Sequence, residues 1–394
     1  MNKFIVRAQQ FLFVLLGVFI PTSIAITNLI VGLLAICWLL EGDFKAKFDV
    51  IKSSKWMLSI FSLIVLYALG MLWGDQHLNA NWQFQRLALL LVFPVLMTMN
   101  LKQETINRAV FAFLGTAFIS ALAAIAINNN IISSLGEYLS FIKLSPNNPA
   151  FIKYNYHNVI LALATTLSFY VLIEKKSKYT NLLLIFIVVY AISIYTERGR
   201  AGQIIFNVSA VFYIIYYNGR NIFRLFALLL LLFSFQFVIY NSTNVYKSRF
   251  DAVSSVIQNN GDRGVGKSED IRYVFVKESL SRILEKPLFG YGTGSFGTIF
   301  ENEVKNEHYF DKHTTPHNQY LYVWFELGIL GLVLLLLIFY HQLKELFRKK
   351  DGIHRVLLPL SFMFLMLVDS YFFIFILTIC YMFLYTIYSR YQQE

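Results

Sequence analysis

The chain has 394 residues, of which 57% are hydrophobic and 17% aromatic, while only 14% are charged. This composition is typical of a membrane protein and excludes an ordinary soluble domain. The formal net charge of +11 does not indicate a nucleic-acid partner, because the basic residues are distributed as in loops between membrane spans.

Apolar runs long enough to cross a bilayer recur along the whole chain and predict about twelve transmembrane helices. They are centred near residues 18, 32, 64, 92, 117, 165, 188, 209, 232, 329, 361 and 379. The first run has no small-residue cleavage site and a second run follows at once, so we interpret it as an uncleaved helix. The predicted fold class is an all-α polytopic membrane protein.

The distribution of Lys and Arg predicts the orientation. With the N-terminus in the cytoplasm, the inside loops and tails carry 19 of these residues and the short outside loops carry five. This asymmetry follows the positive-inside rule and predicts that both termini are cytoplasmic. We therefore expect transmembrane helices in 1–240, a large outside segment at 241–316 that contains amphipathic helices, and transmembrane helices again in 317–394.

Short outside connections carry arginines at the membrane surface. Arg86 ends the turn GDQHLNANWQFQR at the mouth of the fourth span, where an arginine anchors a helix or binds an anionic ligand. Arg198 and Arg200 lie in YTERGRAGQ, between the seventh and eighth spans. Charges at that depth are costly unless they are paired or functional, so this turn is a candidate site. Pairing with Glu197 and lipid phosphates is the structural alternative.

The outside segment 241–316 is long enough to carry function. From Ser268, the run SEDIRYVFVKESLSRIL predicts an amphipathic helix. Its predicted apolar stripe consists of Tyr273, Val276, Leu280 and Ile283 or Leu284. The following run, EKPLFGYGTGSFGTIF, has alternating glycines that predict a loop of exposed backbone N–H groups.

Residues 261–268, GDRGVGKS, satisfy the nucleotide-binding pattern G-x-x-x-x-G-K-[ST]. The preceding DAVSSVIQNN is not a buried strand, and the segment is predicted to lie outside, where nucleotide is scarce. We therefore expect a turn and no nucleotide partner. No metal or cofactor is expected either, because the outside segments lack paired-ligand motifs and the two cysteines, Cys37 and Cys380, lie in predicted spans.

The residues TTPHNQY at 314–320 run directly into the apolar stretch LYVWFELGILGLVLLLLIFY. This pattern predicts Thr315 as the N-cap and His317 in the first helical turn, where the helix dipole favours the neutral base. A capping or interfacial histidine is the alternative. Gly328 and Gly331 fall on the face of His317, where they would let a neighbouring helix approach closely.

The predicted outer face thus combines one histidine with several arginines, namely Arg86, Arg198, Arg200 and, on the amphipathic helix, Arg272. The planar guanidinium group suits phosphate oxygens, as do the free N–H groups of a helix start. A neutral histidine beside such arginines suits the deprotonation of a hydroxyl while a leaving diphosphate is stabilised. The pattern predicts transfer from a diphosphate-linked donor.

The spacing His317-Asn318, nine residues, Gly328, two residues, Gly331 resembles the H-[NSQ]-x9-G-x-x-[GTY] signature of O-antigen ligases. These glycosyltransferases attach undecaprenyl-diphosphate-linked O-antigen to lipid A–core in Gram-negative bacteria. The run 199–203, GRAGQ, resembles the arginine motif of the same family.

The resemblance implies that His317 is the essential histidine and that Arg200 and Arg272 bind the diphosphate, whereas Arg198 and Arg86 match no assigned position. It also implies a metal-independent, inverting reaction in the bacterial inner membrane, with the active site facing the periplasm. The implied partners are the undecaprenyl-diphosphate-linked glycan, lipid A–core and membrane lipids.

Other functions stay open at this point. O-antigen polymerases and protein O-oligosaccharyltransferases share the architecture, although polymerases generally lack the histidine–glycine spacing and protein-glycosylating members are usually longer. A transporter of lipid-linked glycan is the competing class. Transporters place ionisable residues near the middle of the membrane, whereas here the candidate charges lie at one face.

Overall fold

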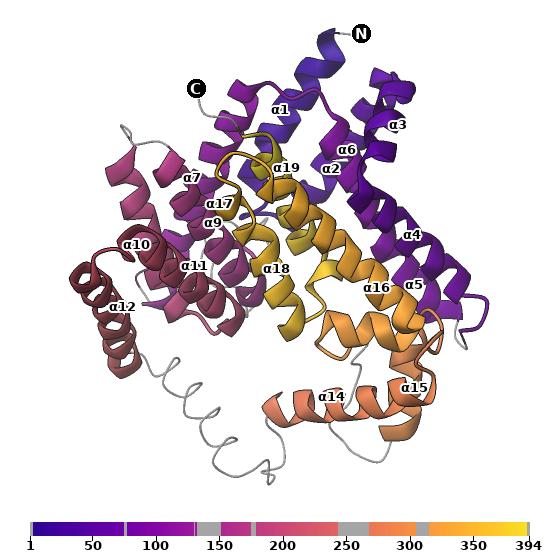
Figure 1. Ribbon diagram of the computed structural model, residues 1–394. Helices are drawn as coiled ribbons and strands as arrows, with labels where there is room; N and C mark the ends of the chain where they lie inside the picture. Colours follow the sequence, from indigo (N-terminus) through magenta and orange to yellow (C-terminus); the bar gives the residue numbers. More distant parts are fainter. Residues whose placement is uncertain are drawn as a thin grey trace. The chain divides into compact units, whose positions relative to one another are not determined.

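The computed structural model describes residues 3–74, 77–129, 131, 151–174, 179–242, 268–304 and 315–391 (Figure 1). Within these ranges the chain forms α-helices and short 3-10 helices, and no strand. Every predicted span centre falls inside a helix, so the all-α class and the positions of these helices are confirmed. Of the pattern GDRGVGKS, only Ser268 lies inside the described residues.

Four of the described helices are individually long and apolar enough to cross a membrane. They are α2 (Ile24–Glu41), α7 (Gln103–Asn128), α12 (Ile222–Ser242) and α16 (Gln319–Phe347). The helices α3 (Phe44–Ser53) and α4 (Lys55–Gly70), bent by 93°, pass the same test together. The chain is therefore a multi-pass membrane protein. The count of about twelve spans, the orientation and the three-part division of the chain stay predictions.

The chain divides into two compact units, each assembled from separate stretches of sequence. The first consists of Met1–Glu41, Asn100–Ser255 and Phe383–Glu394, and the second of Gly42–Met99 and Val256–Met382. The predicted candidate residues are distributed over both, because the arginine turn belongs to the first unit and the histidine to the second.

In the first unit, α9 (Tyr154–Glu174) is the central helix (Figure 1). It packs against α7, α10 (Thr180–Thr196) and α11 (Arg200–Asn218), and every side chain in 157–168 is buried. On the other side of α7 lies α1 (Lys3–Phe19), which also packs against α2. A helix that is buried this completely provides a rigid support for the connection between α10 and α11.

In the second unit, α16 packs along α4 and against α18 (Leu357–Val368) (Figure 1). The remaining elements are α5 (His77–Ala88), η1 (Leu89–Leu91), α6 (Val92–Thr98), α14 (Ser268–Glu285), α15 (Ser295–Val304), α17 (Gly352–Arg355), η2 (Tyr371–Phe373) and α19 (Phe375–Arg390), of which the last continues into the first unit.

The long helix α16 is broken at Gly328, whose φ of 65° and ψ of −165° are open only to glycine. The break frees backbone groups, which the glycine-rich loop satisfies. The carbonyls of Phe325 and Glu326 accept hydrogen bonds from the backbone N–H groups of Tyr291 (2.9 Å) and Gly292 (2.8 Å). The loop is therefore attached to the membrane helix, and the prediction that its N–H groups are exposed is wrong for these two residues.

The structure gives the nearest contacts of the two glycines of α16. A Cβ atom at Gly328 would overlap the backbone carbonyl of Leu288, which belongs to the inserted loop. At Gly331 the nearest atoms belong to side chains of α16 itself, those of Leu327 and Val323. Gly328 thus marks a backbone break against which a loop packs, and the role of the two glycines in helix packing stays a prediction.

The predicted amphipathic helix exists as α14, but its buried face differs from the predicted stripe. Val276, Leu280 and Leu284 are exposed, and only Ile283 of the predicted stripe is buried; the side chain of Tyr273 lies outside the description. The buried face is formed by Phe275, Ser279 and Ile283. Phe275 is buried because its ring packs against two phenylalanine rings of α15, a tertiary contact that the sequence pattern does not contain.

Candidate functional site

His317 lies two residues before the start of α16, with a backbone φ of 52° in the left-handed region that non-glycine residues rarely adopt. The helix begins at Gln319 and its N-cap is Asn318. The Asn318 Oδ1 atom accepts hydrogen bonds from the backbone N–H of Tyr320 (3.0 Å) and of the next residue (3.1 Å). The prediction of Thr315 as N-cap is therefore wrong, because asparagine caps a helix as well as threonine and here occupies the capping position.

The imidazole of His317 is paired with the carboxylate of Asp369, which ends α18. Its Nδ1 atom lies 3.1 Å from Asp369 Oδ1, and the side chains are 26% and 18% exposed. The same oxygen accepts a hydrogen bond from the backbone N–H of Ser370 at 2.7 Å. Because a carboxylate only accepts hydrogen bonds, Nδ1 is the donor, and the lone pair of a neutral imidazole is then on Nε2.

Two further hydrogen bonds fix the histidine segment against α18. Asn318 Nδ2 donates to the carbonyl of Leu367 at 3.3 Å, and the hydroxyl of Tyr320 donates to the carbonyl of Met363 at 3.0 Å. The partners of both bonds belong to the last turns of the helix that presents Asp369. The position of His317 relative to its carboxylate is therefore set by two anchored segments.

The electrostatic setting of His317 also differs from the one predicted. The histidine precedes the N-cap, so it does not lie in the first turn of the helix dipole. It is paired instead with a carboxylate, which stabilises the imidazolium that forms when Nε2 accepts a proton. The neighbouring group that supports a base at this position is Asp369.

An aromatic contact joins α14 to the histidine. The ring centroids of Phe275 and His317 are 5.9 Å apart. Arg272 lies three residues before Phe275 on the same helix, so the backbone brings it within one turn of the residue that contacts His317. The side chain of Arg272 lies outside the description, and its role stays a prediction.

Arg86 lies in the last turn of α5, so the predicted turn GDQHLNANWQFQR is largely helical. Its side chain is half-buried. On the same helix, the Oε1 atom of Gln83 accepts a hydrogen bond from the hydroxyl of Tyr322 on α16 at 3.0 Å. This bond ties the helix that carries Arg86 to the helix that follows His317.

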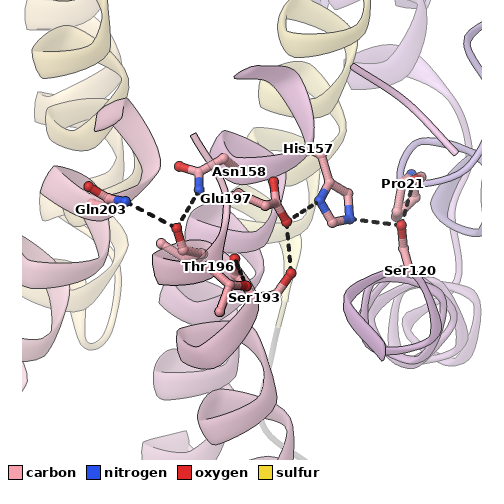
Figure 2. Close-up of polar contacts among 9 residues, drawn as sticks. Pro21, Ser120, His157, Asn158, Ser193, Thr196, Glu197 and Gln203 are labelled. Carbon is pink, nitrogen blue, oxygen red and sulfur yellow. Dashed lines mark hydrogen bonds and ion pairs between the residues drawn. The ribbon is translucent and has the colours of Figure 1, made fainter. Parts of the chain in front are cut away.

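The arginine turn, residues 197–200, connects α10 to α11 in the first unit. Arg198 is exposed, and Arg200 is half-buried at the first position of α11, after Gly199 as N-cap. Glu197 is buried, and its Oε1 atom lies 2.8 Å from His157 Nδ1 and 2.7 Å from Ser193 Oγ (Figure 2). The turn therefore begins with a buried glutamate, and the two arginines follow it within three residues.

Steric contacts explain why glycines flank Arg200 in the arginine motif. A Cβ atom at Gly202 would overlap the carbonyl oxygens of Asn158, and one at Gly199 would lie 2.7 Å from the Cβ of the same asparagine. Asn158 Nδ2 and Gln203 Nε2 both donate to the carbonyl of Ile194, at 2.9 and 3.3 Å. Close approach of α9 to the turn thus requires small residues on both sides of Arg200.

Three important residues were absent from the sequence-based site, namely Asp369, His157 and Glu197 as a buried acid. Asp369 directly follows the apolar run LPLSFMFLMLV, and an acid at the end of a span is a recognisable signal. The pairing of His157 with Glu197 joins residues 40 positions apart and leaves no local pattern. The structure describes the arginine turn and the histidine pair each within its own unit.

Comparison with known proteins gives two matches. Residues 185–336 match the family described as O-antigen ligase, and this range includes the arginine turn, His317 and Gly328. An uncharacterized protein of Haemophilus influenzae is 27% identical over 197 residues, which are 46% of this chain and 48% of that protein. The chain therefore matches about half the length of this relative. The family match confirms the resemblance found in the sequence and supports a glycosyltransferase-like ligase activity.

Proposed function

We propose that this chain, as a protein of the O-antigen ligase family, transfers an undecaprenyl-diphosphate-linked glycan to a sugar hydroxyl of lipid A–core at the periplasmic face of the inner membrane. The observation that carries the proposal is the partly exposed pair of His317 and Asp369, with Nδ1 bound to the carboxylate at 3.1 Å. This arrangement leaves Nε2 as the basic nitrogen, as a general base requires.

In the proposed reaction, Nε2 of His317 takes the proton of the acceptor hydroxyl. The acceptor oxygen forms a bond to the anomeric carbon while the bond from that carbon to the diphosphate breaks, with inversion. Undecaprenyl diphosphate leaves with the bonding electron pair. Asp369 holds the imidazole in the reactive tautomer and stabilises its positive charge after proton transfer.

The arginines are proposed to bind the donor diphosphate. Arg200 stands at the first position of α11, where free backbone N–H groups and a guanidinium group together favour an anion. Arg272 is proposed as the second diphosphate ligand, and Arg198 and Arg86 as further cations for the same donor. Charge neutralisation by these groups requires no metal, cofactor or nucleotide.

Two other functions use the same residues. An O-antigen polymerase would take a second lipid-linked glycan as acceptor, and a protein O-oligosaccharyltransferase would take a protein hydroxyl. We favour ligation because the sequence carries the histidine–glycine spacing of ligases. The transporter alternative is disfavoured because the candidate charges are predicted to lie at one face of the membrane and not near its middle.

The decisive experiment incubates the purified full chain in lipid nanodiscs with an undecaprenyl-diphosphate-linked glycan and one acceptor class at a time, without added metal or ATP. We expect a glycan-modified lipid A–core product, resolved by mass spectrometry. Lengthened glycan on undecaprenyl diphosphate would identify a polymerase instead, and a glycosylated peptide would identify a protein O-oligosaccharyltransferase. Absence of every product in a preparation that binds the donor would contradict all three.

A further inference from the structure

A chain of buried hydrogen bonds lies behind the arginine turn and runs through three helices (Figure 2). Ser120 of α7 lies 2.8 Å from His157 Nε2, and the other ring nitrogen of this histidine lies 2.8 Å from Glu197 Oε1. Ser193, one turn before Glu197 on α10, donates to the same carboxylate oxygen at 2.7 Å. We call these four residues the buried relay.

Both ring nitrogens of His157 form hydrogen bonds, whether the ring is neutral or protonated. The Nδ1–H group donates to Glu197, because the carboxylate only accepts. Nε2 either accepts from the hydroxyl of Ser120 or donates to it, and in the second case Ser120 donates onward to the carbonyl of Pro21 at 3.4 Å. The ring is therefore held at both ends, and it in turn holds the carboxylate at the start of the turn.

The order Ser120, His157, Glu197 resembles the triad of a serine hydrolase, but its surroundings exclude that chemistry. The side chain of His157 is 0% exposed, that of Glu197 1%, and Ser120 is also fully buried. A nucleophile must reach its substrate, and no substrate reaches this hydroxyl. The buried relay can therefore affect function only through the arginine turn, which it holds in place.

A second contact from the same helix fixes the turn from the other side. Asn158, the residue after His157, donates to the carbonyl of Ile194 near the end of α10 (Figure 2). It also packs against Gly199 and Gly202. Two consecutive residues of α9 therefore hold the last turn of α10 and the first turn of α11. Between these fixed ends lie only Glu197, Arg198 and Gly199.

A buried histidine–glutamate pair adds little net stability, because well-packed apolar residues of similar size would stabilise the fold as much or more. In some proteins a buried ion pair specifies a particular geometry instead. Here the specified geometry is that of a short turn whose exposed residue is Arg198 and whose next helix begins with Arg200.

We propose that His157 and Glu197, with Ser120 and Ser193, are positioning residues that hold Arg198 and Arg200 in place for the diphosphate of the donor. This inference rests on the proposed function, because it takes the diphosphate-linked lipid as ligand. Its distinct content is that buried side chains without access to the donor determine the affinity for it.

The test measures the dissociation constant of undecaprenyl diphosphate for the full chain in detergent, by microscale thermophoresis, together with KM and kcat for transfer. Glu197→Gln keeps the size of the side chain but weakens both bonds to it, and we expect binding to weaken roughly tenfold, the equivalent of one charge-assisted contact. Ser193→Ala removes one donor and should weaken binding about threefold. The donor KM should rise in parallel while kcat at saturating donor changes little.

A matched control is Ser209→Ala, which removes an equally buried serine hydroxyl that lies 2.8 Å from Thr166 between α9 and α11. It is not part of the relay, so its donor affinity should equal that of the wild type. A double-mutant cycle then separates positioning from general loosening. If the relay acts through the two arginines, Ser193→Ala should have no further effect on affinity in a background that carries both Arg198→Ala and Arg200→Ala.

Unchanged affinity in both Glu197→Gln and Ser193→Ala would overturn the proposal, as would an equal loss in Ser209→Ala or full additivity with the Arg198→Ala, Arg200→Ala pair. If Glu197→Gln does not fold, the double-mutant cycle with Ser193→Ala is sufficient to test the proposal. A wild-type chain that binds no undecaprenyl diphosphate would also overturn it. A chain that binds this lipid but transfers no glycan would refute the proposed function, and the variants would still test the relay.

Discussion

Among the residues that the structure describes, a histidine is paired with a carboxylate in two places, and the two pairs differ chiefly in exposure. In the first unit, His157 and Glu197 lie 2.8 Å apart with 0% and 1% of their side chains exposed. In the second unit, His317 and Asp369 lie 3.1 Å apart with 26% and 18% exposed. The same two functional groups thus occur once in a sealed interior and once at an accessible surface.

Because the two pairs differ in exposure, we expect them to have different functions. A buried pair has both ring nitrogens engaged and no route to a substrate, so it can fix geometry but cannot exchange protons with a ligand. In the exposed pair Nδ1 is bound to the carboxylate, and Nε2 is the ring nitrogen that the proposed reaction uses. Substitutions at the first pair should therefore affect stability and donor affinity, and substitutions at the second pair should affect the rate of transfer.

The largest expected effect on rate is that of His317→Ala. Loss of a general base typically costs about 10²–10⁴-fold, so this variant should fold and insert normally yet retain little transfer. His317→Gln should do no better, and a His317→Gln variant near wild-type activity would end the assignment as a base.

The corresponding substitution at the buried pair, His157→Leu, should act on stability. It leaves the carboxylate of Glu197 buried without its histidine partner, and breaking a buried pair in this way costs about 3–5 kcal/mol. His317→Leu should change the free energy of unfolding by no more than about 1 kcal/mol, because its pair is partly exposed. Denaturation of both variants in detergent gives the comparison, and equal losses would contradict it.

The third effect, smaller than the first two, is that of Asp369→Asn. The asparagine amide can donate to Nδ1 and so stabilise the tautomer with its proton on Nε2, which cannot act as a base. We expect transfer to fall on the order of 10-fold to 10²-fold, less than the roughly 10⁴-fold loss when the buried carboxylate of a serine-protease triad becomes an amide, because Asp369 is partly exposed. Ser370→Ala keeps the backbone N–H that binds Asp369 and should leave the rate unchanged.

The helices were predictable from the sequence because long apolar runs have few alternatives to a helix in a membrane. Features that depend on contacts between distant segments were not. The capping pattern at Thr315 was plausible by itself, but α18 offers partners to Asn318 and Tyr320, and the helix begins after them. On α14, apolar residues occur on two faces, and only the aromatic cluster with α15 decides that Phe275 is buried.

The candidate site was predictable to the extent that its residues lie in local motifs. His317 and Arg200 were found in this way, and both fall within the matched family range. Asp369 lies 52 residues after His317, and the partner of Glu197 lies 40 residues before it, so neither pairing produces a spacing that the sequence can show. Gly328 was found by its motif, but its reason is the loop inserted at the break of α16.

A third carboxylate, that of Glu285, is more exposed to solvent than those of Glu197 and Asp369. Glu285, at the end of α14, accepts a hydrogen bond from the hydroxyl of Tyr291 at 2.7 Å and pairs with Arg282 at 3.3 Å. The Tyr291 hydrogen bond, and after it the charge of Arg282, lower the pKa of this carboxyl below its ordinary value. Because the group is exposed, the pair should stabilise the fold least of the three.

The smallest expected effect is therefore that of Tyr291→Phe, which removes the hydroxyl and keeps the ring stacked on Phe325. A carboxyl whose pKa is lower in the folded chain stabilises the fold above its ordinary pKa, and this contribution is lost as the pH falls through the folded value. The wild type should thus unfold at a slightly higher temperature than Tyr291→Phe at pH 7, and the difference should narrow at acid pH. Introduced into a Glu285→Gln chain, the same substitution should show no such pH dependence. A Tyr291→Phe difference that is constant with pH would mean that the hydroxyl acts through packing, and the ranking of carboxylates by exposure would then lose its third member.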